Sequence, residues 1–261
     1  MNLQNKWFYI AGVANKKSVA QFTAVELIKH GANIIFSAQN QKNLEQIQKM
    51  HPNSPVFILN VEDENQISNI KNEILKYTDK LDGFLHSLAF ANFSEGPKPF
   101  HETKRSDYLQ ACQISAFSLV EMSNNLKDIF APDASVVTVS ISSTKATSYG
   151  YLGPIKAMLE TSVCYLAKSF SSFSKVRFNS IGSGPLKTSA SAGIPNYIEN
   201  YLYSEKLTLR GESLKTIEVA NTIVFLLSPL SSGVNATNQI VDCGMSSNYF
   251  DQDIVKAFSK I

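Results

Sequence analysis

The chain of 261 residues contains little cysteine and no long apolar run. Its three cysteines, Cys112, Cys164 and Cys243, lie far apart and form no CxxC pair, so the sequence predicts neither a disulfide framework nor a zinc site. Free cysteines indicate a reducing compartment. The first apolar run, Trp7–Ala14, is too short to span a bilayer and lacks the layout of a signal peptide. We expect a cytoplasmic protein with no bound metal and no membrane segment.

An excess of charge of one sign is also missing. Lys and Arg number 24 against 22 Asp and Glu, a formal net charge of +2. This balance argues against nucleic-acid binding driven by phosphate contacts. Hydrophobic residues make up 44% of the chain and charged residues 18%, which excludes extensive disorder.

Short apolar runs alternate with longer amphipathic stretches along the whole chain. These runs show little polar alternation, as expected of strands covered on both faces. They are Trp7–Ile10, Asn33–Ser37, Val56–Leu59, Gly83–Ser87, Ser135–Ser140, Val176–Ile181 and Gln239–Asp242. Strands alternating with helices predict an α/β fold, a Rossmann-type doubly wound seven-stranded parallel sheet with ligands at the carboxyl ends of the strands.

No change of composition and no internal repeat divides the chain, so we expect a single domain over residues 1–261. Among its helices, Asp107–Phe130 and Gly153–Phe173 are expected to be long. A long irregular stretch follows the sixth strand, and we expect a substrate loop or lid around residues 183–212 that contains a short helix over Asn196–Leu209.

The usual GxGxxG fingerprint of dinucleotide-binding proteins is absent after the first strand. Only Gly12 remains of it, in the turn that precedes Ser18. Ser18 is a good helix N-cap, and its alternative role is a hydroxyl at a helix N-terminus that faces a pyrophosphate. A strand–glycine–helix turn alone leaves cofactor binding open.

Five separated segments, in one order along the chain, carry a more specific signal. They are Gly12–Ala20, Phe36–Asn40, Asp82–Ala91, Val176–Thr188 and a carboxyl-terminal pair, Leu230–Gly233 with Val241–Gly244. Together they resemble the bacterial NADH-dependent enoyl-acyl-carrier-protein reductases of the FabI type, within the short-chain dehydrogenase/reductase superfamily.

The resemblance implies a cofactor site and part of a substrate site. Gly12, Ser18 and Val19 would contact the pyrophosphate and the neighbouring ribose, and Gln39 would meet the adenosine ribose. The remaining implied cofactor contacts are Asn60 and Val61 at the adenine, Leu88 along the dinucleotide, and Leu186, Lys187, Thr188, Ser189 and Ala190 around the nicotinamide. The backbone of Leu186 would hold the carboxamide, and Ala91 would lie beside the acyl substrate.

Position 39 favours NADH over NADPH. Neither an acid nor an arginine stands there, so nothing at Gln39 receives a 2′-phosphate, although Lys42 lies three residues further on. Asn60 can still accept a hydrogen bond from the adenine amino group.

Tyr149 and Lys156 are separated by six residues after the fifth strand, the spacing found in the enoyl reductases. The resemblance implies that Tyr149 hydrogen-bonds the thioester oxygen as it becomes an enolate, and that Lys156 holds the nicotinamide ribose. Such a donor stabilises charge as it develops in the transition state. His86, by contrast, is interpreted as a core residue, since no second ligand clusters with it.

This same region departs from the family. Ser140 is followed by Ile141 where the family has a second tyrosine, and only nine positions separate Ser140 from Tyr149. Two alternatives to an enoyl reductase therefore stay open. One is a short-chain reductase acting on another carbonyl or enone, and the other is a catalytically weakened NADH-binding paralogue.

The partners implied by the resemblance are acyl carrier protein and further copies of the chain. The acidic helix of the carrier would meet basic residues such as Lys187 or Arg210. The two long predicted helices would form the interfaces of a homotetramer, whereas neither a nucleic acid nor a membrane is expected as a partner.

Overall fold

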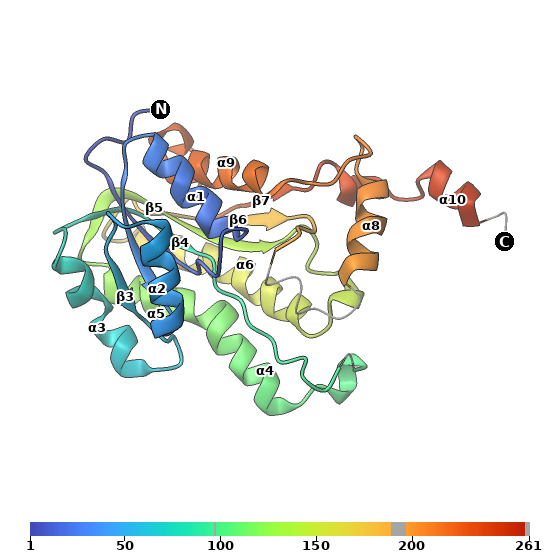
Figure 1. The fold of residues 1–261 in the computed structure, drawn as a ribbon, viewed down its shortest axis with the longest axis horizontal. Helices are drawn as coiled ribbons and strands as arrows, with labels where there is room; N and C mark the ends of the chain where they lie inside the picture. The colour runs from blue at the N-terminus through green and yellow to red at the C-terminus, as the bar shows by residue number, and fades with distance from the viewer. Residues whose placement is uncertain (97, 189–196, 259–261) are drawn as a thin grey trace.

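The computed structural model describes residues 1–96, 98–188 and 197–258, and Figure 1 shows their arrangement. A single sheet of seven strands, all paired in parallel, runs through the middle in the order β3-β2-β1-β4-β5-β6-β7. The strands are β1 Trp7–Ala11, β2 Asn33–Ala38, β3 Val56–Ile58, β4 Leu81–His86, β5 Phe130–Ile141, β6 Arg177–Ser183 and β7 Asn238–Val241. The predicted seven-stranded doubly wound fold is confirmed.

Helices cover both faces of this sheet, as Figure 1 shows. One face carries α1 Val19–Lys29, α2 Gln41–Met50 and α9 Thr216–Leu227; the other carries α3 Glu64–Leu75, α4 Arg105–Cys112, α5 Ser118–Leu126 and α6 Leu152–Phe170. Two further helices, α8 Tyr197–Leu207 and α10 Gln252–Phe258, follow β6 and β7, and α10 projects away from the body of the molecule.

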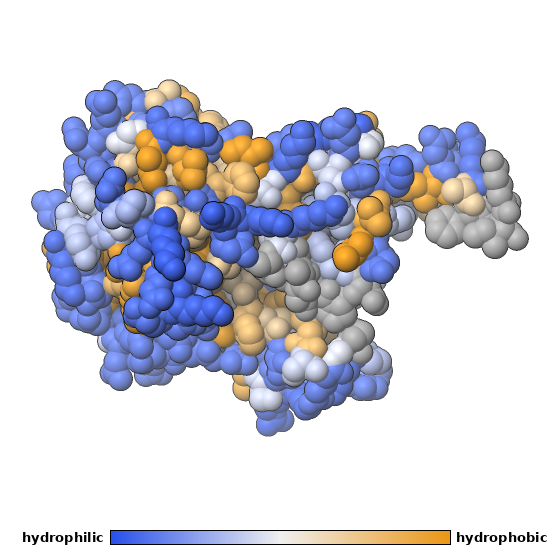
Figure 2. Space-filling view, viewed as in Figure 1, coloured by the Kyte–Doolittle hydropathy of each residue, from blue (hydrophilic) through white to orange (hydrophobic). Residues whose placement is uncertain are grey.

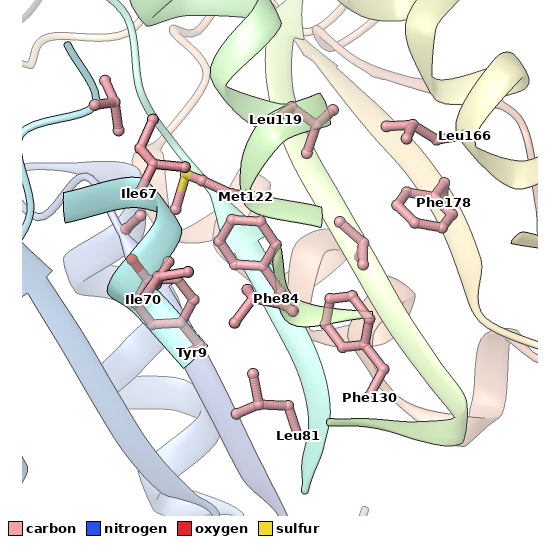
Figure 3. Packing of buried hydrophobic residues seen from close by; sticks show 14 of the residues in the cluster. Tyr9, Ile67, Ile70, Leu81, Phe84, Leu119, Met122, Phe130, Leu166 and Phe178 are labelled. Carbon is pink, nitrogen blue, oxygen red and sulfur yellow. The ribbon is translucent and has the colours of Figure 1, made fainter. Parts of the chain in front are cut away.

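Aromatic and branched side chains fill the larger of the two cores, shown in Figure 3. Tyr9 lies between Phe57 and Phe84, with ring centroids 5.8 and 5.0 Å away. Its hydroxyl shares a 2.6 Å hydrogen bond with Ser37, so the one polar atom of this ring is satisfied. Because β1 is covered on both faces, its central residues are all apolar or paired, which explains the lack of alternation in the sequence.

The long helix predicted over Asp107–Phe130 is wrong in its bounds. The structure divides this stretch into α4, a π-helical segment Gln113–Phe117 and α5, and Phe130 already begins β5. Within the π-helical segment, the hydroxyl of Ser115 accepts from the backbone N–H of Phe90 at 2.8 Å and donates to the carbonyl of Phe90 at 3.0 Å. This contact comes from a loop distant in sequence, so local periodicity does not report it.

None of the helices in the described parts of the chain is both long and apolar enough to cross a membrane. The face seen in Figure 2 is largely hydrophilic, with apolar side chains gathered over the end of the molecule where α1 and α9 lie. Ile28 on α1 and Phe225 on α9 are among the exposed apolar residues.

Candidate active site

The predicted site residues gather along one edge of the sheet. Because all strands are parallel, the segments that follow them leave from the same edge. Gly12 follows β1, Gln39 follows β2, and Tyr149 stands in the segment after β5. Asn60, Leu88 and Leu186 follow β3, β4 and β6 in the same way. The fold therefore assembles residues that lie far apart in the sequence into one region.

The turn at Gly12 brings the ends of β1 and β4 into contact. Gly12 has a φ of 104°, and a Cβ built on it would lie 2.0 Å from the carbonyl oxygen of Ser87. No side chain fits there, which explains why this glycine is present although the rest of the usual fingerprint is not. Ser18 then caps α1, because its hydroxyl accepts from the backbone N–H of Gln21 at 3.3 Å.

The residues expected around the adenosine differ in exposure. Gln39, directly after β2, is exposed. Lys42, near the start of α2, is exposed as well. The side-chain oxygen of Asn60 accepts from the backbone N–H of Glu62 at 3.2 Å, so this amide also shapes its own turn. Val61 is 6% exposed and belongs to the larger core, against which Leu88 and Ala91 also pack.

Tyr149 ends a short 3₁₀ turn, Thr147–Tyr149, just before α6. It lines a cavity of about 250 Å³, whose other walls include Asn92, Phe93 and Lys104 from the loop after β4, and Tyr151. Burial, together with a smaller effect of Tyr197, raises the pKa of the Tyr149 phenol to about 12. The phenol is therefore protonated at neutral pH and able to donate a hydrogen bond.

Lys156 stands in the first half of α6 and is 4% exposed. Its Nζ donates to the backbone carbonyl of Val139 at 2.8 Å. Burial lowers the pKa of this ammonium to about 8, and the nearby Glu160 carboxylate works in the opposite direction. A lysine with a pKa this close to neutrality is typical of functional sites.

Sequence reasoning missed Glu160. Its carboxylate accepts a hydrogen bond from the hydroxyl of Ser140 at 2.5 Å, and burial raises its pKa. A signal for it was present, since Glu160 follows Lys156 by four residues, so the two side chains share one face of α6. Ser140, which ends the buried part of β5, thus points to α6.

The nicotinamide side of the predicted site is built around Leu186, which is 6% exposed. The hydroxyl of Tyr197, the first residue of α8, accepts from the backbone N–H of Leu186 at 2.8 Å and donates to its carbonyl at 2.9 Å. Lys187 is exposed, with its Nζ 4.4 Å from the centre of the Tyr201 ring. Thr188 is half-buried, whereas Ser189 and Ala190 lie outside the described residues.

His86 is fully buried in β4. Its ring nitrogens share 2.9 Å hydrogen bonds with the hydroxyls of Thr138 and Ser118. Burial lowers its pKa to about 3, so the ring is neutral, and the structure agrees with its interpretation as a core residue. Among the residues that the structure describes, no group of three or more His, Cys, Asp or Glu side chains is suited to hold a metal ion.

The parallel sheet, the glycine turn after β1 and the tyrosine and lysine beside α6 define a Rossmann-type α/β protein with its site at the carboxyl edge of the strands. Comparisons with known proteins identify the family. The profile of the family described as "Enoyl-(Acyl carrier protein) reductase" matches residues 12–246. The chain belongs to this enoyl-acyl-carrier-protein reductase family, and the family predicted from the sequence motifs is confirmed.

Individual relatives agree with this assignment. The chain is 34% identical to the NADH-dependent enoyl-acyl-carrier-protein reductase FabI of Enterococcus faecalis, over 94% of this chain and 99% of that one. It is 30% identical to the NADPH-dependent FabI of Staphylococcus aureus (strain MRSA252), over 94% and 98%. The crystal structure of the NADH-dependent reductase from Aquifex aeolicus VF5 matches with a TM-score of 0.89 and 27% identity, over 94% of this chain and 97% of that one.

Proposed function

We propose that the protein reduces trans-2-enoyl thioesters, carried on acyl carrier protein, to acyl thioesters with NADH in fatty-acid elongation. The observation that carries the proposal is the cavity of about 250 Å³ with Tyr149 in its wall; Lys156 does not line this cavity but stands two turns further along, in α6. Relatives over nearly the full length of the chain are named as reductases of this kind.

The residues on the edge of the sheet fit a dinucleotide. The backbone at Gly12 turns without a side chain, and α1 begins directly after this turn, so its N-terminus is suited to a pyrophosphate held near Val19. The exposed amide of Gln39 can bind ribose hydroxyls, but it offers no positive charge to a 2′-phosphate. NADH is therefore the proposed cofactor, although relatives of both cofactor types exist.

When bound, NADH supplies a hydride to the β-carbon of the enoyl thioester. Tyr149 donates a hydrogen bond to the thioester oxygen, where negative charge grows as the enolate forms. Its raised pKa keeps the phenol proton in place for this task. Lys156 would hold the nicotinamide ribose through its ammonium, and the positive charge would favour the developing enolate. The backbone of Leu186 would hold the carboxamide once its N–H is released from the hydroxyl of Tyr197, and Lys187, Thr188, Ser189 and Ala190 would surround it.

Residues 183–212 form the proposed substrate loop and lid of a single domain that spans the chain. Support comes from the contacts of α8 with the segment after β6. Tyr197 bonds both backbone groups of Leu186, and Tyr201 lies under the ammonium of Lys187. Ala91, which packs against the larger core after β4, is proposed to lie beside the acyl chain.

The acidic helix of acyl carrier protein is proposed to dock near Lys187. The second predicted docking residue, Arg210, is less suited, because both of its terminal nitrogens pair with the carboxylate of Glu218 at 2.7 and 2.8 Å. Exchange of Lys187 for glutamate is expected to raise KM for a carrier-bound substrate more than KM for a coenzyme A thioester, because the carrier presents a whole acidic helix to this position.

We also propose a homotetramer built on α4 to α6. Large apolar side chains remain exposed there, with Leu109 on α4 at 59%, Phe117 at 49% and Tyr165 on α6 at 75%. A molar mass of one chain, measured in solution by light scattering, would contradict the proposed homotetramer. A cytoplasmic location is retained as well, because all three cysteines are free thiols.

NADH oxidation with crotonyl thioesters tests the main proposal. The expected result is consumption of NADH with one equivalent of the saturated butyryl thioester, detected by mass spectrometry. Turnover with ketones but not with enoyl thioesters would favour a reductase of another carbonyl class. Binding of NADH with no turnover on any enoyl thioester would favour a paralogue that has lost catalysis.

A further inference from the structure

Two side chains from one turn of α6 bind two consecutive residues of β5. Lys156 donates to the carbonyl of Val139 at 2.8 Å, and Glu160, one turn later, accepts from the hydroxyl of Ser140 at 2.5 Å. The pair fixes how α6 lies along β5. Since the short turn that ends at Tyr149 leads into α6, the same contacts also fix the position of the proposed active-site residues.

The charges around Lys156 are few. Lys156 is 4% exposed, and its ammonium donates a hydrogen bond to an uncharged group, the carbonyl of Val139. A buried cation is costly unless an opposite charge lies close to it. Glu160 on the same helix is half-buried and acts on Lys156.

Two further titratable groups of this part of the fold carry no charge near neutral pH. Lys156 also acts electrostatically on His86 on β4, whose burial lowers its pKa to about 3, so the ring is neutral. Tyr149, in the turn before α6, has a pKa raised to about 12 and stays protonated. Among the described residues, Glu160 therefore supplies the negative charge that acts on Lys156, without an ion pair within 4.0 Å.

We propose that Glu160 is a positioning residue of the reductase, which anchors α6 to Ser140 and keeps Lys156 in its ammonium form for the cofactor ribose. The role in ribose binding rests on the proposed function, whereas the effect on the charge of Lys156 does not. Glu160 itself is not expected to touch the substrate or the dinucleotide.

Removal of the carboxylate charge is expected to lower the pKa of Lys156. Without Glu160, the neutral amine of Lys156 becomes more favourable, so the ammonium loses its proton at a lower pH. We expect the loss of one interacting charge in this partly buried region to lower the pKa of Lys156 by about one unit. NADH binding is then lost at a pH about one unit lower than in the wild type.

The experiment compares three variants by the Kd of NADH, measured by fluorescence between pH 6 and pH 9.5. Glu160→Gln retains an oxygen for the Ser140 hydroxyl but lacks the charge. Ser140→Ala retains the charge but lacks the hydrogen bond, and Glu160→Asp retains a carboxylate. We expect the midpoint of the alkaline loss of binding to fall by about one pH unit in Glu160→Gln only, with Kd at pH 6 within about threefold of wild type. Urea unfolding of each variant identifies any loss of folding.

A uniform weakening at every pH, or a midpoint in Glu160→Gln equal to that of the wild type, would overturn the proposal. A second readout needs no cofactor, namely the pKa of Lys156 by NMR of lysine labelled with ¹³C at Cε. It is expected to fall in Glu160→Gln and to be unchanged in Ser140→Ala. Failure of the wild type to bind NADH would count against the proposed function, while the NMR result still decides the role of Glu160.

Discussion

The two halves of the site are built differently. In the half formed by β1 to β3, local turns do the shaping, through a close backbone approach and short-range hydrogen bonds. Gly12 lies against Ser87 with no room for a side chain, and the turns are closed by Ser18 and Asn60 through their own side chains. In the half formed by β5 and β6, side chains do it, because Lys156 and Glu160 bind β5 and Tyr197 binds Leu186.

This difference explains where the chain follows its family and where it departs. Backbone geometry at a turn admits few residue types, so the segment around Gly12 keeps a recognisable pattern. A wall made of side chains tolerates exchange, provided the functional groups keep their places. Ile141 and the shortened segment before Tyr149 lie in that second half. The comparison predicts large structural effects of substitution in the first half and large catalytic effects in the second.

The largest structural effect is expected for Gly12→Ala. The new methyl group would meet the Ser87 carbonyl, and the φ of 104° is unfavourable for alanine. Strain and collision together lower the free energy of unfolding by about 3 kcal/mol or more, measured by urea denaturation. Gly211→Ala is the matched control, since its φ of 69° is also positive but its Cβ meets no atom within 4 Å. An equal loss in both variants would show that the close approach to Ser87 contributes nothing.

The largest catalytic effect is expected for Tyr149→Phe. Loss of a donor to a developing oxyanion costs about 3–4 kcal/mol, or roughly 10²–10³-fold in kcat. The Kd of NADH should change little. Tyr151→Phe is the control, because Tyr151 lines the same cavity and its hydroxyl donates to the carbonyl of Asn92 at 3.1 Å. It is expected to lose less than about tenfold, as for an ordinary hydrogen bond. Wild-type turnover in Tyr149→Phe would remove this residue from catalysis.

A smaller effect is expected when NADH binding is measured as a function of pH. The pKa of Lys156 is lowered to about 8, so its ammonium is present below pH 8 and is lost as the pH rises through this value. NADH binding is predicted to weaken on the alkaline side with a midpoint near pH 8, measured by fluorescence titration. The phenol of Tyr149 does not account for this midpoint, since its pKa is raised to about 12. In Lys156→Met, binding should be weaker at pH 7 and flat across this range; a preserved midpoint would assign the titration to another group.

The smallest effect is expected at the adenosine ribose. Gln39→Arg places a positive charge where a 2′-phosphate would lie, so KM for NADPH should fall several-fold relative to KM for NADH. Lys42→Ala tests whether the neighbouring exposed lysine already supplies this charge. A clear preference of the wild type for NADPH, abolished in Lys42→Ala, would contradict the predicted use of NADH.

The fold was largely predictable, because most strands are short apolar runs buried between the helices on the two faces of the sheet. Helix bounds were less so. The π-helical segment at Gln113–Phe117 includes Ser115, whose hydrogen bonds reach Phe90 across the fold, and no local pattern contains that contact. For the same reason β5 begins at Phe130, far earlier than the apolar run at Ser135 indicates. Just before β5, the carbonyl of Ile129 accepts a hydrogen bond from the backbone N–H of Leu81, the first residue of β4, at 2.7 Å.

The site was predictable as a set of positions along one edge, but not as a set of contacts. Motif resemblance pointed to Tyr149 and Lys156, whereas Glu160 carries no motif that names its partner. Its bond to Ser140 depends on the register between α6 and β5, which only the folded chain defines. Arg210 illustrates the opposite case, because its charge suggested a docking residue while the fold pairs it with Glu218.

Transfer of deuterium from NADH labelled at C4 of the nicotinamide to crotonyl thioester tests the central claim most directly. Two runs, each with label on one face of the ring, are followed by mass spectrometry and NMR of the product. The account predicts that one of the two runs yields butyryl thioester with a single deuterium on the β-carbon. Absence of deuterium from the product in both runs, or deuterium on a carbon other than the β-carbon, would contradict it.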